Sequence, residues 1–376
     1  MIIKNAEVFC EDNQFHWGDV FIQDGLFVNS VQEEDSVIDA SGLYAVPGLT
    51  DIHFHGCAGY DFCDASLEAV QAMAEYQAEH GITSICPATM TLPEEELEKI
   101  MQTAEVYESI SGADFCGIHM EGPFLSAKRK GAQHESYLQK PNLKVFQKLQ
   151  KLSGGKIKLV SLAPELTDAM DFIEAVKEQV MVSLAHTDAD YETAKEALEK
   201  GAGHVTHLYN AMPPLHHRNP GVIGAARDQE NCRVEIICDG MHIHPSVIRA
   251  TFELFGDNRI VMISDSMRAT GMPDGVYTLG GQEVEVCGRK AVLKSDGSLA
   301  GSVTNLMDCV RYAVLQAGIP LESAIKAAAV NSAKAIGIYD KYGSITFGKA
   351  ANLVLLNQKL EIQAVILRGE LYKCNW

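Results

Sequence analysis

The feature that most limits how this chain can fold is a repeated alternation of apolar, strand-like runs with amphipathic helical stretches between residues 49 and 342. Each run is short and rich in β-branched residues, as is typical of a buried strand. Strands that alternate with helices predict parallel pairing and right-handed crossovers. The runs are 49–55, 81–89, 114–121, 156–165, 179–186, 203–210, 232–240 and 259–265.

Eight such units are the number that closes a (β/α)8 barrel of about 250 residues. The clearest helical stretch, "DADYETAKEALEKG", offers Asp188 or Asp190 as its N-cap and Gly201 as its C-terminal stop. An open doubly wound sheet is the structural alternative, but no G-x-G-x-x-G follows the early strands. The sequence therefore predicts an α/β fold in which 49–342 form a TIM-like (β/α)8 barrel.

The two ends of the chain have a different pattern. Residues 1–48 and 343–376 consist of short β-branched pieces punctuated by glycine and other turn residues. Neither end is long enough to bury a core alone. We therefore expect both termini to pair into a second, small β-sandwich domain beside the barrel.

Charge and cysteine usage narrow the class of protein. The formal net charge is −19 and no block of Lys and Arg is long enough to follow a phosphate backbone, which disfavours nucleic acid as a partner. The chain shows no signal-peptide pattern at Met1 and no long uncharged apolar run, so we expect no membrane association and a cytoplasmic protein. The ten cysteines are scattered without a C-x-x-C pair, so we expect them to be reduced.

Polar residues mark the carboxyl ends of the predicted strands, where a barrel collects its catalytic groups. His53 and His55 in "LTDIHFHG" share one face because strand side chains alternate. Polar residues also end the seven later runs: Thr89, Glu121, Glu165, His186, His207, Asp239 (with His242 just beyond) and Asp265. From these we select as metal candidates His53, His55, Glu121, His186, His207 and Asp265.

Imidazole and carboxylate ligands together favour Zn²⁺ or Fe²⁺ over Mg²⁺ or Ca²⁺. Water bound to such an ion is acidic enough to attack near neutral pH, so the expected chemistry is hydrolysis. Asp265, on the last strand, is well placed to accept the proton of that water and pass it to the leaving group as general base and acid. The similar pair His242 and His244 follows "DG" outside a strand, so His242 is expected to contact substrate and His244 to cap the next helix. His16, His80 and His119 are expected to be ordinary surface or core residues.

Several longer motifs carry a resemblance to a known family. They are "VPGLTDIHFHG", "GIHMEGPFLSAKRKGAQ", "SLAHTDADYETAKEALEKGAGHVTHLYNAMPP", "GVIGAA", "CDGMHIHP", "ISDSMRATG", "LAGS" and the terminal "GKAANLVLL". With them the chain resembles the amidohydrolase superfamily, in the branch that removes the acetyl group of N-acetylglucosamine 6-phosphate. The resemblance implies that the products are glucosamine 6-phosphate and acetate.

The resemblance also implies roles for individual residues. Glu121, His186 and His207 would form a first metal site, and the intact His53 and His55 would permit a second, so one or two ions per subunit are expected. Residues matched to sugar-phosphate binding are Asn210, Ala211, Arg218 and His242. Because the arginine of the family reaches a neighbouring subunit, a homodimer is expected. An arginine suits this role because its planar fork grips phosphate oxygens in pairs.

Two assignments stay open at the sequence level. Some relatives have a histidine after "KRKG" that contacts the substrate, whereas this chain reads "AQHE", so either Gln133 or His134 takes that place. Ser302 in "LAGS" either lines the pocket or only forms a turn before a helix starting near Val303.

Other functions remain as alternatives. These are the same reaction on N-acetylgalactosamine 6-phosphate, a different amidohydrolase acting on a cyclic amide or an N-acyl amino acid, and a non-catalytic sugar-phosphate sensor. An intact Asp265 beside intact metal candidates disfavours the sensor.

Overall fold

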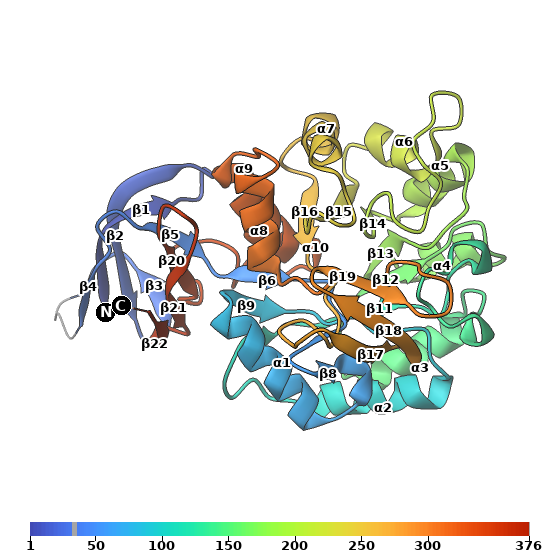
Figure 1. Ribbon diagram of the computed structural model, residues 1–376, viewed down its shortest axis with the longest axis horizontal. Helices are drawn as coiled ribbons and strands as arrows, with labels where there is room; N and C mark the ends of the chain where they lie inside the picture. Colours follow the sequence, from blue (N-terminus) through green and yellow to red (C-terminus); the bar gives the residue numbers. More distant parts are fainter. Residues whose placement is uncertain (32–35, 376) are drawn as a thin grey trace.

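A β-rich part built from both chain ends lies beside a larger α/β part in the computed structural model, which describes residues 1–31 and 36–375 (Figure 1). The strands from the chain ends are β1 (Ile2–Phe9), β2 (Phe15–Gln23), β3 (Leu26–Val28), β4 (Val37–Asp39), β5 (Tyr44–Pro47), β20 (Leu353–Leu356), β21 (Ile362–Leu367) and β22 (Glu370–Cys374). The central parallel strands are β6 (Leu49–Asp51), β9 (Ile82–Ile85), β10 (Asp114–Phe115), β11 (Ile118–Glu121), β12 (Ile157–Leu162), β13 (Met181–Leu184), β14 (His204–Val205), β15 (Arg233–Ile237) and β16 (Ile260–Ile263).

The parallel strands follow the chain in order around a curled, TIM-like sheet. β11 to β16 form one parallel sheet in sequence order, and β6, β9 and β10 form another. A parallel bridge between Ala88 and His119 joins the two sheets on one side. On the other side the Asp265 N–H donates to the His53 carbonyl at 2.9 Å. Strands such as β16 are buried along their whole length, as expected for a parallel sheet covered by helices.

A helix follows each of these strands on the outside of the sheet, apart from the short β10, which leads directly into β11 (Figure 1). The helices are α1 (Leu67–Glu79), α2 (Glu94–Val106), α3 (Leu143–Leu152), α4 (Ala169–Val176), α5 (Tyr191–Lys200), α6 (Gly221–Asp228), α7 (Pro245–Phe255), α8 (Leu306–Leu315), α9 (Leu321–Ile325) and α10 (Asn331–Ala335). The α5 caps are those expected: the Asp190 carboxylate accepts from the Thr193 N–H at 2.9 Å, and Gly201 ends the helix at φ 131°. His244 caps α7, as predicted.

Each of the predicted runs contains a strand, but the strands are shorter than the runs. β6, for example, ends at Asp51, so His53 and His55 lie just beyond it. The chain stays paired there, since the His55 N–H donates to the Ser266 carbonyl at 2.7 Å. Glu121 is the last residue of β11, whereas the other metal candidates lie just beyond the ends of their strands: His53, His55, His186, His207 and Asp265.

The strands from the two chain ends pair directly with one another. β20 runs antiparallel to β5, and within the described residues the sheet has the order β22-β21-β20-β5-β1-β2-β3, with β4 beside β1. A separate apolar cluster fills its inner face; its members include Ile3, Phe27, Leu353 and Ile366. Arg368 ties this sheet to the parallel strands by donating to Asp114 at 2.8 Å.

An antiparallel insertion interrupts the last strand-and-helix unit and was not foreseen from the sequence. It consists of β17 (Gly275–Leu279), β18 (Gln282–Cys287) and β19 (Lys290–Leu293). The signal that predicts such hairpins is an alternating run with glycine at its turns, here Gly280 and Gly281 in the first turn and Gly288 in the second. A further hairpin pairs β7 (Gly56–Cys57) with β8 (Tyr60–Asp61).

Two further observations concern the cysteines and the helices. All ten cysteines are free, as expected, and Cys57 is buried. Among the helices of residues 1–31 and 36–375, none has the length and apolar character needed to cross a bilayer.

Candidate metal centre and active site

Glu121, His186 and His207 converge at the carboxyl ends of β11, β13 and β14. Glu121 Oε1 lies 3.2 Å from His186 Nε2 and 3.1 Å from His207 Nε2. The two Nε2 atoms are themselves 3.1 Å apart. We call these three residues the first donor set; all three side chains are buried.

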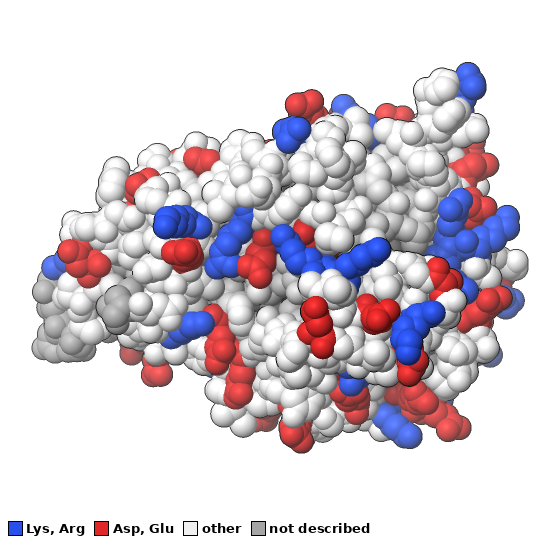
Figure 2. Space-filling model, in the orientation of Figure 1, with Lys and Arg blue, Asp and Glu red and all other residues white. Residues whose placement is uncertain are grey.

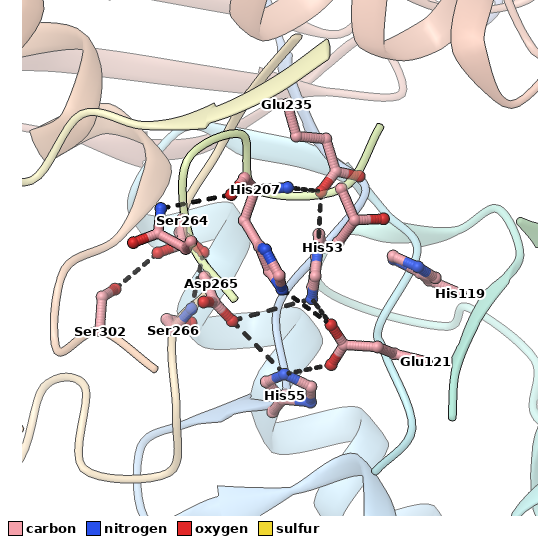
Figure 3. A network of polar contacts seen from close by, with 12 residues as sticks. His53, His55, His119, Glu121, His207, Glu235, Ser264, Asp265, Ser266 and Ser302 are labelled. Atoms are coloured by element: carbon pink, nitrogen blue, oxygen red, sulfur yellow. Dashed lines mark hydrogen bonds and ion pairs between the residues drawn. The ribbon is translucent and has the colours of Figure 1, made fainter. Parts of the chain in front are cut away.

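His53, His55 and Asp265 form a second donor set next to the first (Figure 3). Asp265 Oδ1 lies 3.4 Å from His55 Nε2 and 3.8 Å from His53 Nε2. Glu121 borders this set as well, with its Oε2 atom 3.3 Å from His55 Nε2. Figure 3 shows Glu121 and His207 of the first set next to the side chains of the second set. The six metal candidates chosen from the sequence thus meet at one place.

The geometry of the first set fits a cation. Two imidazole nitrogens that face each other at 3.1 Å cannot both accept or both donate a hydrogen bond. A cation between them, in contrast, takes a lone pair from both nitrogens and from the carboxylate. Mixed nitrogen and oxygen donors of this kind are typical of sites for zinc and related transition metals.

The backbone at these residues is unusual for side chains with a Cβ. His186, His207 and Asp265 have φ values of 42°, 29° and 50°. Positive φ is costly outside glycine and clusters at functional sites, where the surrounding structure enforces it. These conformations end the strands and turn the side chains inward.

Hydrogen bonds to the rest of the chain orient the donors. His186 Nδ1 lies 2.9 Å from the Arg129 carbonyl, so this nitrogen donates and Nε2 is left for the site. The Gln133 side-chain amide donates to Glu121 Oε2 at 2.8 Å, and its oxygen accepts from the Thr91 N–H at 2.7 Å. Gln133 therefore contacts the first donor set directly, by its hydrogen bond to Glu121.

Charges within the chain shift the pKa values of the second set. Burial acts to lower the pKa of His55, but hydrogen bonds to Asp265 and Glu121 outweigh it and raise that pKa to about 9. Burial acts to raise the pKa of Asp265, and the hydrogen bond from His55 with the nearby histidine charges lowers it to about 2. In the chain without metal, the Asp265 carboxylate is thus ionised near neutral pH.

A cavity of about 250 Å³ opens beside the donor sets. Its lining includes several residues predicted to bind substrate, namely Gln133, Asn210, Ala211 and His242. His242 Nδ1 lies 2.8 Å from Asp239 Oδ2. Burial acts to lower the pKa of His242, but the Asp239 hydrogen bond and charge raise it. The cavity wall therefore includes an imidazole whose cationic form Asp239 favours.

Three other predicted residues do not line this cavity within one chain. Arg218 is exposed on the loop between β14 and α6. His134 stacks on Tyr137 with ring centroids 4.6 Å apart. Ser302 is buried behind Asp265: its hydroxyl donates to the Ser264 carbonyl at 2.6 Å, and its N–H donates to the Asp265 carbonyl at 2.7 Å.

Sequence reasoning missed two kinds of contributor. Glu235, buried in β15, contacts His53, and a charged residue inside an otherwise apolar strand was the available signal. The insertion supplies Leu279, and the segment after it supplies Ser298 and Leu299, to the cavity wall. Gln282 also donates to the Ala132 carbonyl next to Gln133 at 2.5 Å.

The remaining strand-end residues have structural contacts. The Glu165 carboxylate accepts from the Thr187 hydroxyl at 2.5 Å and from the Asp188 N–H at 2.6 Å. His119 is a buried core residue, as expected, with its Nε2 atom 2.7 Å from the Ser161 hydroxyl.

A curled parallel sheet with such donors at its carboxyl mouth is the arrangement of a metal-dependent hydrolase. The model of the amidohydrolase family matches residues 44–372. The chain therefore belongs to the amidohydrolase family.

Within that family the chain is similar to N-acetylglucosamine-6-phosphate deacetylases. It is 37% identical to the one from Bacillus subtilis (strain 168), covering 99% of this chain and 96% of the relative. It is 33% identical to the one from Bos taurus, covering 98% and 93%. These relatives place the chain in the N-acetylglucosamine-6-phosphate deacetylase branch of the family.

Solved structures agree with the sequence comparison. The N-acetylglucosamine-6-phosphate deacetylase of Pasteurella multocida superposes with a TM-score of 0.93 at 30% identity, covering 100% of this chain and 99% of that one. A mutant deacetylase of Mycobacterium smegmatis in complex with N-acetyl-D-glucosamine-6-phosphate superposes with a TM-score of 0.91 at 29% identity, covering 99% and 98%. The same overall α/β fold is thus found in proteins of that name.

Proposed function

We propose that this chain is a metal-dependent hydrolase that converts N-acetylglucosamine 6-phosphate to glucosamine 6-phosphate and acetate. The observation that carries the proposal is the convergence of Glu121, His186 and His207 next to Asp265, at the mouth of a fold shared with deacetylases of this substrate. Sequence similarity over nearly the whole chain supports the same reaction.

The two donor sets divide the binding of metal between them. Glu121, His186 and His207 would hold a first divalent ion, and His53, His55 and Asp265 a second, with Zn²⁺ or Fe²⁺ the metals that suit these ligands. When bound, such an ion supplies Lewis acidity, which makes water more acidic and polarises an amide carbonyl. Glu121 contacts both donor sets, because its Oε1 atom faces His207 and its Oε2 atom faces His55.

Asp265 moves the proton in this proposal. Its ionised carboxylate takes a proton from the attacking water as the new C–O bond forms at the acetyl carbon. It then gives that proton to the sugar nitrogen as the C–N bond breaks, so that acetate and the free amine leave. Asp265 is about a tenth exposed at its side chain, which leaves it open to the cavity.

The sugar phosphate would be held by residues around the cavity. Asn210, Ala211 and His242 line it, and His242 has the raised pKa that favours contact with an anion. Gln133 and Ser302 would act close to the scissile amide through Glu121 and Asp265. His134, which stacks on Tyr137 outside the cavity, is left without a substrate contact in this proposal. On the face of the molecule seen in Figure 2, basic side chains alternate with acidic ones, so a phosphate needs a local cationic pocket rather than a broad basic surface.

Arg218 completes the phosphate site from a second copy in this proposal. Its position on an exposed loop leaves the guanidinium free to reach a neighbouring subunit's cavity. The working protein is then a homodimer. Arg218→Ala should raise KM for the phosphorylated substrate in the dimer, and sedimentation would report the oligomeric state.

The domain division proposed from the sequence is a small β-sandwich of residues 1–48 and 343–376 and a (β/α)8 barrel of residues 49–342. The antiparallel pairing of β5 with β20 supports it, because it brings both chain ends into one sheet. A cytoplasmic location remains a prediction, to be checked by cell fractionation.

The test is a comparison of acetate release from three substrates. N-acetylglucosamine 6-phosphate should react much faster than unphosphorylated N-acetylglucosamine, because only the former engages the cationic groups. N-acetylgalactosamine 6-phosphate, which differs at one hydroxyl, serves as the specificity control. Equal rates with and without the phosphate would contradict the assignments of Arg218 and His242.

A further inference from the structure

Glu235 is a carboxylate placed inside the parallel sheet, in the middle of β15. Its side chain is fully buried, and its neighbours along the strand are Val234 and Ile236. Burying a carboxylate costs several kcal/mol unless it has a charged or hydrogen-bonded partner. We therefore expect Glu235 to have a buried partner that donates a hydrogen bond to its carboxylate or carries a positive charge.

The contacts of Glu235 reach both donor sets. Its Oε2 atom lies 2.8 Å from His53 Nδ1 and accepts from the backbone N–H of His207 at 3.1 Å. His53 is 182 residues away in the chain and His207 is 28 residues away. Figure 3 shows Glu235 on the side of His53 opposite to Glu121.

The other polar groups in this layer have partners of their own. His119 Nε2 is 2.7 Å from the Ser161 hydroxyl, and His204 Nδ1 is 3.1 Å from the Ser183 hydroxyl. His204 Nδ1 also lies 3.8 Å from Glu235 Oε1, so the shortest contact of this carboxylate, at 2.8 Å, is with the imidazole of His53. A carboxylate that accepts from the far nitrogen of a histidine fixes which nitrogen faces a metal and makes that nitrogen a better donor.

We infer that Glu235 is a positioning residue that holds the proton of His53 on Nδ1, directs His53 Nε2 toward Glu121 and Asp265, and fixes the backbone at His207. This inference rests on the proposed metal-dependent function. His186 has a neutral counterpart, the Arg129 carbonyl, which accepts from its Nδ1 atom at 2.9 Å. Glu235 thus joins the two donor sets through one carboxylate oxygen.

Zinc affinity, measured by competition with a chelator, provides the first test. Glu235→Gln keeps the size of the side chain and removes its charge, and it should weaken zinc binding about tenfold, at the lower end of the effect of such partners. Glu235→Leu also removes the acceptor and should weaken zinc binding up to about 100-fold. Ser183→Ala is the matched control, since it removes a polar group from the same layer without touching either donor set, and it should stay within about twofold.

A nuclear magnetic resonance measurement of the histidine protons provides the second readout. The signal of the His53 Nδ1–H is identified as the one that disappears in His53→Asn. This slowly exchanging signal should be present in the intact protein and in Glu235→Gln, and it should be lost in Glu235→Leu. Zinc affinity of Glu235→Gln within twofold of the parent overturns the inference, even if Glu235→Leu fails to fold. So does an intact protein without the His53 Nδ1–H signal.

These readouts are independent of the substrate. If the parent protein releases no acetate from the sugar phosphate but Glu235→Gln still loses zinc affinity, the proposed reaction is wrong and the role of Glu235 stands. If the parent releases acetate and zinc affinity is unchanged in Glu235→Gln, the proposed reaction stands and the role of Glu235 is wrong.

Discussion

The two donor sets have similar chemistry but differ in how tightly they converge. In the first set, Glu121 Oε1 lies within 3.2 Å of both histidine nitrogens. In the second set, Asp265 Oδ1 lies 3.4 and 3.8 Å from its two histidines. The first set comes from β11, β13 and β14, which belong to one continuous parallel sheet, whereas the second spans the junction between β6 and β16. A continuous ladder of strands thus gives the more preorganised ligand set.

This difference predicts an order of binding. The first set should fill at a lower metal concentration, because little rearrangement is needed to gather its donors. The second set should fill later and also supply the proton carrier. The variants below change one side of this comparison at a time, beginning with the largest expected effect.

Asp265→Asn should have the largest effect on turnover. The amide cannot carry the proton, so acetate release should fall about 10²- to 10⁴-fold while the first set still binds metal. Acetate assays with parallel metal analysis check this. Asp171→Asn, an exposed carboxylate on α4, controls for the loss of one charge. Asp265→Asn activity within tenfold of the parent would remove Asp265 from the mechanism.

Glu121→Gln should damage both sets together. Its oxygens face His186 and His207 on one side and His55 on the other, so the loss of charge weakens the binding of either ion. Because Lewis acidity contributes several kcal/mol, we expect acetate release to fall about 100-fold. Metal content after dialysis should fall in parallel. A variant that keeps full metal content would show that Glu121 is not a shared ligand.

Exchanging both His53 and His55 for Asn should affect only the second set. Metal content should fall by one ion per subunit if two are bound in the parent, and acetate release should fall about tenfold, as when a supporting ligand is lost. The matched comparison is the double exchange of His186 and His207, which should abolish the tighter site. If the site that remains in each double variant binds metal with the same affinity, the proposed order of binding is contradicted.

Asp239→Asn should have the smallest effect, since it changes the charge beside His242 without altering a metal donor. In the folded protein Asp239 raises the pKa of His242, so the imidazolium persists above the ordinary histidine range. Without that charge, His242 becomes neutral at lower pH. Losing one charge-assisted hydrogen bond to phosphate costs about 1 kcal/mol more than losing a neutral one, so KM at neutral pH should rise about fivefold.

The effect of Asp239→Asn on KM should depend on pH. The difference between Asp239→Asn and the parent should narrow as the pH falls, because His242 becomes protonated in the parent first and in the variant at lower pH. A constant difference as the pH falls would mean that the charge of His242 does not contribute to binding.

A comparison of β6 with β15 shows which site residues could be predicted from the sequence. The alternation around His53 and His55 and their position after an apolar run marked them as site residues, because strand periodicity is a local property. Glu235 lies in a run with the same apolar character, but its partner His53 is 182 residues away. Nothing in the local pattern of β15 indicates that pairing. The antiparallel insertion of β17 to β19 was also missed, because the prediction for residues 49–342 assumed that strands and helices alternate throughout.

The sequence by itself determined the alternation of parallel strands and helices, the pairing of the two chain ends, and the polar residues carried at the strand ends. These depend on periodicity, capping and turn residues, which act over a few neighbours along the chain. The tertiary structure alone decided that Gln133 contacts Glu121, that Ser302 lies behind Asp265, and that Glu235 joins the two donor sets. These contacts depend on the distance and direction between residues on separate strands, which are set only when the sheet curls and its ends meet.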